Sequence, residues 1–202
     1  MSELAAYLQL GFRHITDLRG ADHILFLLAL AAIYRFRDWR ECLWVATAFT
    51  AGHSLTLALA VTNVLTISPR LIEFLIPITI VATGLENLLV RDNATPFATR
   101  RYRPVLAGVF GLVHGAGFAN YLRSLFVERI ALPLFGFNVG IELGQICVLA
   151  LAFAAFGLVD RLITAARPSR LLSVAPVRLR AVAVSSLVLV VAARWAVERA
   201  PW

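Results

Sequence analysis

The chain has no lysine, two cysteines and few charged residues, and each scarcity excludes a class of protein. Cys42 and Cys147 lie far apart, in or beside apolar stretches, so the sequence predicts neither a disulfide scaffold nor a cysteine-based metal site. Charged residues make up 15% of the 202 residues and hydrophobic ones 60%. Because soluble chains contain about 25% charged residues, this composition excludes an ordinary water-soluble domain and indicates an integral membrane protein.

The basic residues number 19, all of them arginine, against 12 acidic residues. In a soluble protein the resulting formal charge of +7 would suggest nucleic-acid binding. Here the arginines stand between long apolar runs, which is typical of cytoplasmic flanks that face anionic lipid. We therefore expect the lipid bilayer, and no nucleic acid, to be the partner of these residues.

Long apolar windows mark the expected membrane helices, each of which needs about 20 largely apolar residues. The windows cover residues 15–34, 42–63, 70–90, 104–123, 132–158 and 179–197. Gly20 and its charged neighbours are expected to interrupt the first window and to leave the residues before it at the membrane interface. The predicted fold is all-α, a polytopic membrane helix bundle of about six transmembrane helices, forming one integral membrane domain over residues 1–202.

The arginines also predict the orientation, because short cytoplasmic loops carry an excess of positive charge. The connections after the first, third and fifth windows hold Arg35, Arg37, Arg40, Arg91, Arg100, Arg101, Arg103, Arg161, Arg167, Arg170, Arg178 and Arg180. The connections after the second and fourth windows hold only Arg70, Arg123 and Arg129. We therefore expect both termini to lie on the outer side of the membrane.

All four histidines, His14, His23, His53 and His114, fall in or at the mouth of an expected membrane helix. Ionisable groups within a bilayer are costly, face the bundle interior and usually mark a site or a transport path. Asp22 directly precedes His23, so the two side chains can serve one metal or act as ligand and supporting partner.

Further polar residues share faces with these histidines or lie on the helices opposite. Thr50 and Ser54 accompany His53, while Asn138, Glu142 and Gln145 follow one another along one face of the window 132–158. From the rise of a helix, these groups converge near the level of the histidines.

Glu86 and Asn87 fall nearer the cytoplasmic end, where they are expected to form a second station for a moving cation. Gly111 and Gly115, one turn apart beside His114, are expected to let a neighbouring helix approach closely. Imidazole together with carboxylate favours a divalent transition metal such as nickel, cobalt or zinc over magnesium or calcium.

Five blocks of sequence, in order, resemble the HupE/UreJ family of bacterial membrane proteins over about residues 11–150. They are Gly20-Ala21-Asp22-His23-Ile24-Leu25-Phe26, Thr47 to Leu57 with the core Thr50-Ala51-Gly52-His53-Ser54, Glu86-Asn87, Phe110 to Ala119 with Val113-His114-Gly115, and Phe137 to Gln145 with Asn138 and Glu142. The resemblance implies a nickel, or nickel and cobalt, permease of the bacterial inner membrane. It also implies a possible link to the maturation of nickel enzymes such as hydrogenase and urease.

Three functions remain open at this point, and transport is favoured. In the permease hypothesis, His23, His53, His114, Asp22 and Glu142 bind the metal. The transport path or supporting layer is expected to comprise Asn138, Gln145, Ser54, Thr50, Glu86, Asn87 and His14. The alternatives are a membrane-embedded zinc hydrolase similar to alkaline ceramidases, in which Ser54 would sit near a metal-bound water, and a metal-binding accessory protein without transport. The hydrolase would need a His-x-x-x-His pair in its last helix, and the window 179–197 has no histidine.

Overall fold

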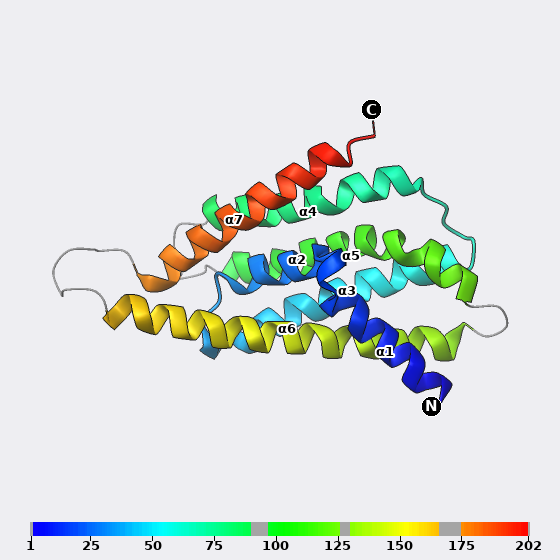
Figure 1. Cartoon of the computed structure of the whole chain (residues 1–202), viewed down its shortest axis with the longest axis horizontal. Coiled ribbons are helices and arrows are strands. Elements are labelled where there is room, and N and C mark those ends of the chain that lie inside the picture. The colour runs from blue at the N-terminus through cyan, green and yellow to red at the C-terminus, as the bar shows by residue number, and fades with distance from the viewer. Residues whose placement is uncertain (1, 90–96, 126–129, 166–174, 202) are drawn as a thin grey trace.

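The computed structural model describes residues 2–89, 97–125, 130–165 and 175–201, with only the backbone for 97–101 and 120–125. Its elements are α1 (Glu3–Thr16), η1 (Leu18–Gly20), α2 (Asp22–Ala31), η2 (Phe36–Asp38), α3 (Trp39–Val61), α4 (Pro69–Leu89), α5 (Phe97–Leu125), α6 (Ala131–Ala165) and α7 (Pro176–Glu198). The long helices run roughly along one axis (Figure 1). The expected all-α class is therefore confirmed for the part of the chain that is described.

Four helices are long and apolar enough to cross a membrane: Phe36–Val61 (which includes η2), Pro69–Leu89, Ala131–Ala165 and Pro176–Glu198. They correspond to four of the six expected windows. Helix α5 covers the window 104–123. Within the described ranges, Asp22–Ala31 is a shorter apolar helix.

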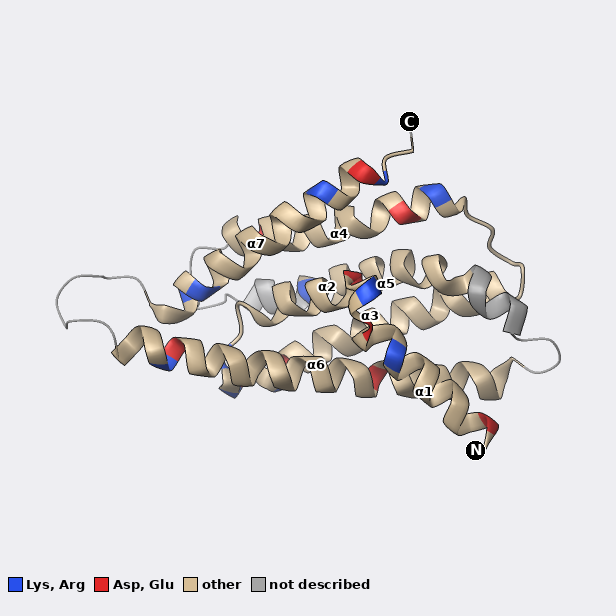
Figure 2. Ribbon diagram, in the orientation of Figure 1, with Lys and Arg blue, Asp and Glu red and all other residues tan. Residues whose placement is uncertain are grey.

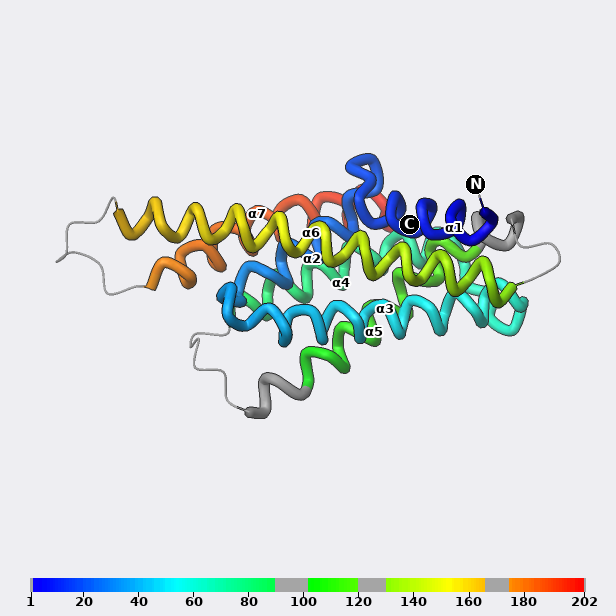
Figure 3. Tube along the Cα trace, turned by 90° about the horizontal axis from the view of Figure 1, so that it is seen from below, coloured from blue at the N-terminus to red at the C-terminus, as the bar shows by residue number. Residues whose placement is uncertain are grey.

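The first expected span, residues 15–34, is not one continuous helix. Helix α1 ends at Thr16, and Asp17 adopts an extended backbone with its side chain accepting a hydrogen bond from the Arg19 amide at 2.9 Å. The turn η1 follows, and α2 begins at Asp22. The break expected near Gly20 is present, and the residues before it form a helix that packs along α6 (Figure 3).

Glycine makes the contact between α1 and α6 close. A Cβ atom placed on Gly140 of α6 would lie 2.1 Å from the carbonyl oxygen of Leu8, and one on Gly11 would lie 2.0 Å from that of Phe137. Real Cβ atoms do not come this near to backbone oxygen, so glycine is required on both helices. The sequence prediction missed this because it assigned no helix to residues 3–14.

Helices α3 and α5 approach each other in the same way, as expected from Gly111 and Gly115. A Cβ atom on Gly115 would lie 2.2 Å from the carbonyl oxygen of His53, and one on Gly111 would lie 2.0 Å from that of Phe49. The expected close approach is confirmed, and it brings the middle of α3 against the middle of α5.

Helix α7 packs on α4 and also holds the short helix α2. The buried Arg180 guanidinium donates to the carbonyl oxygens of Ala32 and Tyr34, at 3.1 Å and 2.7 Å, and forms an ion pair with Asp160. These bonds satisfy carbonyl groups that the end of α2 leaves without helical partners. Helix α7 therefore anchors the end of α2 as well as packing on α4.

Helices α2, α4 and α6 finish toward one end of the bundle, on the left in Figure 1, and α3, α5 and α7 begin there. Figure 2 shows few charged residues along the ribbons and a separate charged group around the break between α1 and α2. We call the end at which α2, α4 and α6 finish the arginine-rich end, after its described residues Arg35, Arg37, Arg40, Arg161 and Arg178. Arg91, Arg129, Arg167 and Arg170 lie outside the described residues, as do the side chains of Arg100, Arg101 and Arg123.

Candidate metal centre

The four histidines meet in the middle of the bundle, and we call them the histidine cluster. They come from four different helices: His14 from the last turn of α1, His23 from the first turn of α2, and His53 and His114 from the middle of α3 and α5. Ring centroids are 4.6 Å apart for His14 and His23, 5.8 Å for His14 and His53, and 6.0 Å for His23 and His53. The break between α1 and α2 supplies two of the four.

Three of these side chains form a group suited to a metal ion. His14, His23 and His53 each offer one ligand nitrogen, and these atoms all lie within 4.8 Å of one another. Nitrogens bound to a tetrahedral metal at about 2.1 Å stand about 3.4 Å apart. Binding would therefore require the rings to close by about an ångström, which side-chain rotation can supply.

His23, His53 and His114 are buried and His14 is half-buried, and several ring nitrogens of the cluster lack hydrogen-bond partners among the described residues. The side chain of His53 is fully buried, and neither of its ring nitrogens has a partner. The Nε2 atoms of His14 and His23 are also buried without one. Buried polar atoms are normally hydrogen-bonded, and an exception calls for an explanation such as an absent ion or water.

His114 lies beside this group, with its ring centroid 5.1 Å from that of His23. Its Nε2 is 2.9 Å from the Thr79 hydroxyl, which itself donates its proton to the Ile76 carbonyl at 2.7 Å. A hydroxyl has one proton, so Thr79 must accept from an Nε2–H group. Neutral His114 then carries an unprotonated Nδ1, which is buried without a partner and free to bind a metal.

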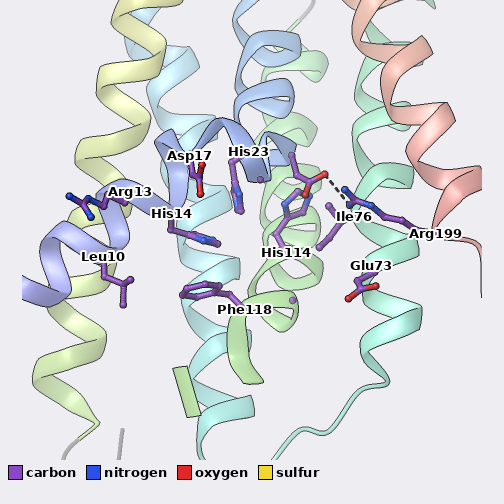
Figure 4. A pocket seen from close by; sticks show the side chains of 13 residues that line it. Leu10, Arg13, His14, Asp17, His23, Glu73, Ile76, His114, Phe118 and Arg199 are labelled. Carbon is purple, nitrogen blue, oxygen red and sulfur yellow. Dashed lines mark hydrogen bonds and ion pairs between the residues drawn. The ribbon is translucent and has the colours of Figure 1, made fainter. Parts of the chain in front are cut away.

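A cavity of about 360 Å³ leads to the cluster. His14, His23 and His114 line it (Figure 4), and His53 is not among its lining residues. Asp17, Asp22 and Glu73 also line the cavity, together with Arg13 and Arg199. Because Arg199 pairs with Asp22, Asp17 and Glu73 are the lining carboxylates with the freer charge to attract a cation.

Asp22 itself faces α7 rather than the three-histidine group. Its carboxylate accepts a hydrogen bond from Arg199 at 3.2 Å, and Figure 4 shows Arg199 on the side of the cavity away from His14. The structure therefore places Asp22 at the rim of the cavity and does not bring it into the group with His14, His23 and His53.

Aromatic rings enclose the cluster. Phe118 packs on His14 with centroids 4.1 Å apart, and Phe49 lies 5.0 Å from His114. Phe118 and Phe137 stack on each other at 5.3 Å. Such walls lower the local dielectric and strengthen the interaction of a cation with the few polar groups present.

The expected residues of α3 and α6 form a separate set, the α3–α6 polar layer, consisting of Thr47, Thr50, Glu142 and Gln145. Thr47 donates to the Glu142 carboxylate at 3.4 Å, and Thr50 donates to the Gln145 side-chain oxygen at 3.1 Å. This layer is not part of the three-histidine group.

Two neighbouring residues complete this account of α3 and α6. The Ser54 hydroxyl donates to the Thr50 carbonyl at 2.7 Å, within its own helix. Asn138 keeps its side-chain oxygen buried without a hydrogen-bond partner among the described residues.

Glu86 and Asn87 lie toward the arginine-rich end, apart from the histidines. Glu86 pairs with Arg103 at 2.7 Å. Asn87 donates to the Ala29 carbonyl at 2.7 Å and to the Ser185 hydroxyl at 3.1 Å, which ties α4 to α2 and α7.

The sequence places His14 only in the expected transport path or supporting layer, and its pattern indicates no role for Thr79. Thr79 stands on the same face of α4 as Thr83 and Glu86, a stripe that the sequence shows, but its pairing with His114 depends on how α4 meets α5.

A family profile described as HupE / UreJ protein matches residues 1–199. No curated protein and no solved structure matches the chain.

Proposed function

The chain belongs to the HupE/UreJ family, and from this and the histidine cluster we propose that it is a membrane permease for a divalent transition metal. Nickel or cobalt is the cargo that the family resemblance favours. His14, His23 and His53 hold the ion, with His114 joining them through Nδ1. The bacterial inner membrane is the proposed location, and a system that matures nickel enzymes is the proposed recipient.

One observation carries this proposal: three buried ligand nitrogens from three helices come within 4.8 Å of one another, and those of His53 have no hydrogen-bond partner in the described structure. In a bilayer such groups are too costly to keep without a function. Neutral imidazoles suit nickel, cobalt and zinc and are poor ligands for magnesium and calcium.

The broken helix supports transport rather than a fixed structural site. Discontinuous membrane helices, whose ends meet near the middle of the bundle, are the usual way in which transporters build ion sites. Here α1 and α2 meet at residues 17–21, and both halves contribute a histidine. Small movements of either half would change the number of histidines that reach the ion, so the site can bind and release it.

The remaining polar groups take supporting roles in the proposal. Asp22, with Glu73, receives the cation at the rim of the cavity. Glu142, with Asn138 and Gln145, borders the ion path from α6. Transfer toward the arginine-rich end would bring the ion to Glu86.

The membrane arrangement is part of the same proposal. Helices α1 and α2 together make the first crossing, and α3 to α7 make the other five. Both termini lie outside, with the arginine-rich end in the cytoplasm, and the whole chain is one membrane domain. This orientation places the open cavity on the outer side, where a metal ion arrives.

Uptake by purified protein in proteoliposomes tests the proposal. Radioactive nickel, cobalt and zinc are offered to vesicles holding the parent protein or His53→Ala, with Cys147→Ser, a substitution outside the histidine cluster, as the control. We expect nickel or cobalt uptake in the parent and the control and none in His53→Ala. Stoichiometric zinc that stays bound without any flux would overturn the permease and indicate a fixed catalytic or structural site.

A further inference from the structure

A second cavity lies on the far side of the histidine cluster, toward the arginine-rich end. Its volume is about 150 Å³, and its lining includes Phe26, Leu30, Thr83, Glu86 and Arg103. Helices α2, α3, α4 and α5 all contribute to it. These two cavities therefore lie on opposite sides of the histidine cluster. The first reaches the histidines, and the second is lined by the ion pair of Glu86 and Arg103.

Aromatic side chains separate the two cavities. Phe26 and Phe49 stack with centroids 4.7 Å apart, and these rings lie 6.1 Å and 5.0 Å from that of His114. Phe26 also lines the second cavity. An ion that leaves the histidines in this direction must pass these two rings before it meets another charged group.

The next charged group on this route is the Glu86 carboxylate, which is already paired with the guanidinium of Arg103. Arg103 is only 6% exposed, and its guanidinium pairs with Oε1 of Glu86 at 2.7 Å. The Tyr102 hydroxyl donates to the same oxygen, and the Tyr34 hydroxyl is hydrogen-bonded to Arg103. The Nε and Nη2 atoms of Arg103 are both buried without a hydrogen-bond partner in the described structure, so the contact of Nη2 with Glu86 is an ion pair without hydrogen-bond geometry.

Arg180 shows what a buried structural arginine in this fold is like. Its guanidinium is bound by the carbonyl oxygens of Ala32 and Tyr34 and by Asp160, and it lines neither of the two cavities. Arg103 instead lines a cavity, and its described partners are the side chains of Glu86 and Tyr34 rather than the carbonyl groups of a helix end. An arginine held this way can be displaced from its partner without undoing a helix end.

We propose that Arg103 is the gate of the permease: a tethered cation that neutralises Glu86 while no metal is present and is displaced when the metal arrives. This inference rests on the proposed function. It adds a point at which the ion path is closed, the pair of Arg103 and Glu86, between the histidine cluster and the arginine-rich end. With Arg103 in place the second cavity offers no free carboxylate, so protons and monovalent cations gain no favourable binding site there. A divalent metal interacts more strongly with Glu86 than a single positive charge does, and can take its place.

Equilibrium binding of nickel to metal-free protein in detergent tests the gate. We expect one nickel per parent molecule, held by the histidines. Arg103→Gln should gain a second site, because Glu86 is then free, and Arg103→Gln combined with Glu86→Gln should lose it again. Arg103→Lys, which keeps the charge, and Arg194→Gln, which removes an exposed arginine, should both bind one.

The outcomes separate the two proposals. A parent that binds nickel through His53, with Arg103→Gln binding the same number at the same affinity, would overturn the gate and leave the permease standing. A parent whose nickel binding does not depend on His53 would overturn the permease and the gate with it.

A measurement without any change at Arg103 covers the case in which its variants do not fold. Cys42 of α3 is fully buried, and the charge of Arg103 is close enough to act on its thiol group. In Cys147→Ser protein, we expect nickel to raise the rate of Cys42 alkylation about tenfold over that in magnesium, a change that corresponds to about 1.4 kcal/mol. An identical rate in both metals would overturn the gate.

Discussion

The histidine cluster and the α3–α6 polar layer both include side chains from α3, yet they differ in how their polar atoms are satisfied. In the α3–α6 layer, hydroxyl groups of Thr47 and Thr50 donate to oxygens of Glu142 and Gln145, and the Gln145 amide nitrogen is buried without a partner in the described structure. In the histidine cluster, the nitrogens of His53 and the Nε2 of His23 are buried without partners there. Hydroxyl groups bonded to neighbouring oxygens hold helices together, and an amide N–H group has no lone pair for a metal, whereas an unprotonated imidazole nitrogen can bind one.

This comparison separates residues that look alike in the sequence. His53 and Thr50 lie one turn apart on α3, and both are buried. Only His53 presents nitrogen lone pairs to other imidazoles, so metal binding should depend on it far more than on Thr50. Four predictions test the contrast, in order of decreasing expected effect.

The largest effect is expected from separating α3 and α5 at the cluster. Gly115→Leu would place a side chain within 2.2 Å of the His53 carbonyl oxygen if nothing moved, so the helices must shift apart. We expect a loss of about 3 kcal/mol or more in the free energy of unfolding, together with loss of metal binding. Gly157→Leu is the control, because a Cβ atom there meets nothing within 4 Å. Thermal unfolding in detergent checks both, and equal stability of the two variants would contradict the close contact.

The next effect concerns the ligands. His23→Ala removes one of three nitrogens in the group, and we expect nickel affinity to fall by at least about 100-fold, more than is usual for loss of a supporting partner. Thr47→Val, which alters only the α3–α6 layer, should change affinity by less than about threefold. Isothermal titration of purified protein measures both. Similar losses in the two variants would remove the distinction between the clusters.

A smaller effect is expected from the tautomer of His114. Thr79→Val removes the hydroxyl that accepts from Nε2–H, so the ring is no longer held with Nδ1 unprotonated and aimed at the cluster. We expect about a tenfold loss of metal affinity, as is usual for supporting partners of metal-bound histidine. Thr79→Ser keeps the hydroxyl and should restore parental affinity. If Thr79→Val and Thr79→Ser bind equally well, this hydrogen bond does not set the tautomer.

The smallest effect is expected from Glu142→Gln. Its side-chain oxygen can still accept from Thr47, so nickel affinity should stay within about threefold of the parent, while uptake slows because a charge beside the path is lost. Parallel titration and proteoliposome uptake separate these two quantities. A fall in affinity as large as that of His23→Ala would make Glu142 a direct ligand.

The sequence predicted the helical class, the location of four long apolar helices and the close contact made by Gly111 and Gly115. These features depend on local composition and spacing, which a single chain displays. The gathering of His23, His53 and His114 was also expected, since an ionisable residue within a membrane must face the interior. Family resemblance added the cargo, which no pattern of residues supplied.

Other features depend on how helices meet and could not be obtained from spacing. His14 joins the cluster only because α1 folds back along α6, and the glycines that allow this were not assigned to any contact. Arg103 stood in a connection and was assigned to topology, whereas the structure buries it against Glu86. Asp22 adjoins His23 in sequence, but the end of α7 brings Arg199 to it.

X-ray absorption spectroscopy of the nickel-loaded or zinc-loaded protein shows directly whether the histidine cluster binds the metal. We expect at least three imidazole nitrogens around the metal, at about 2.0–2.1 Å for zinc, and loss of one of them in His14→Ala. A first shell made only of oxygen, or an imidazole count that the His14→Ala and His53→Ala variants leave unchanged, would contradict it.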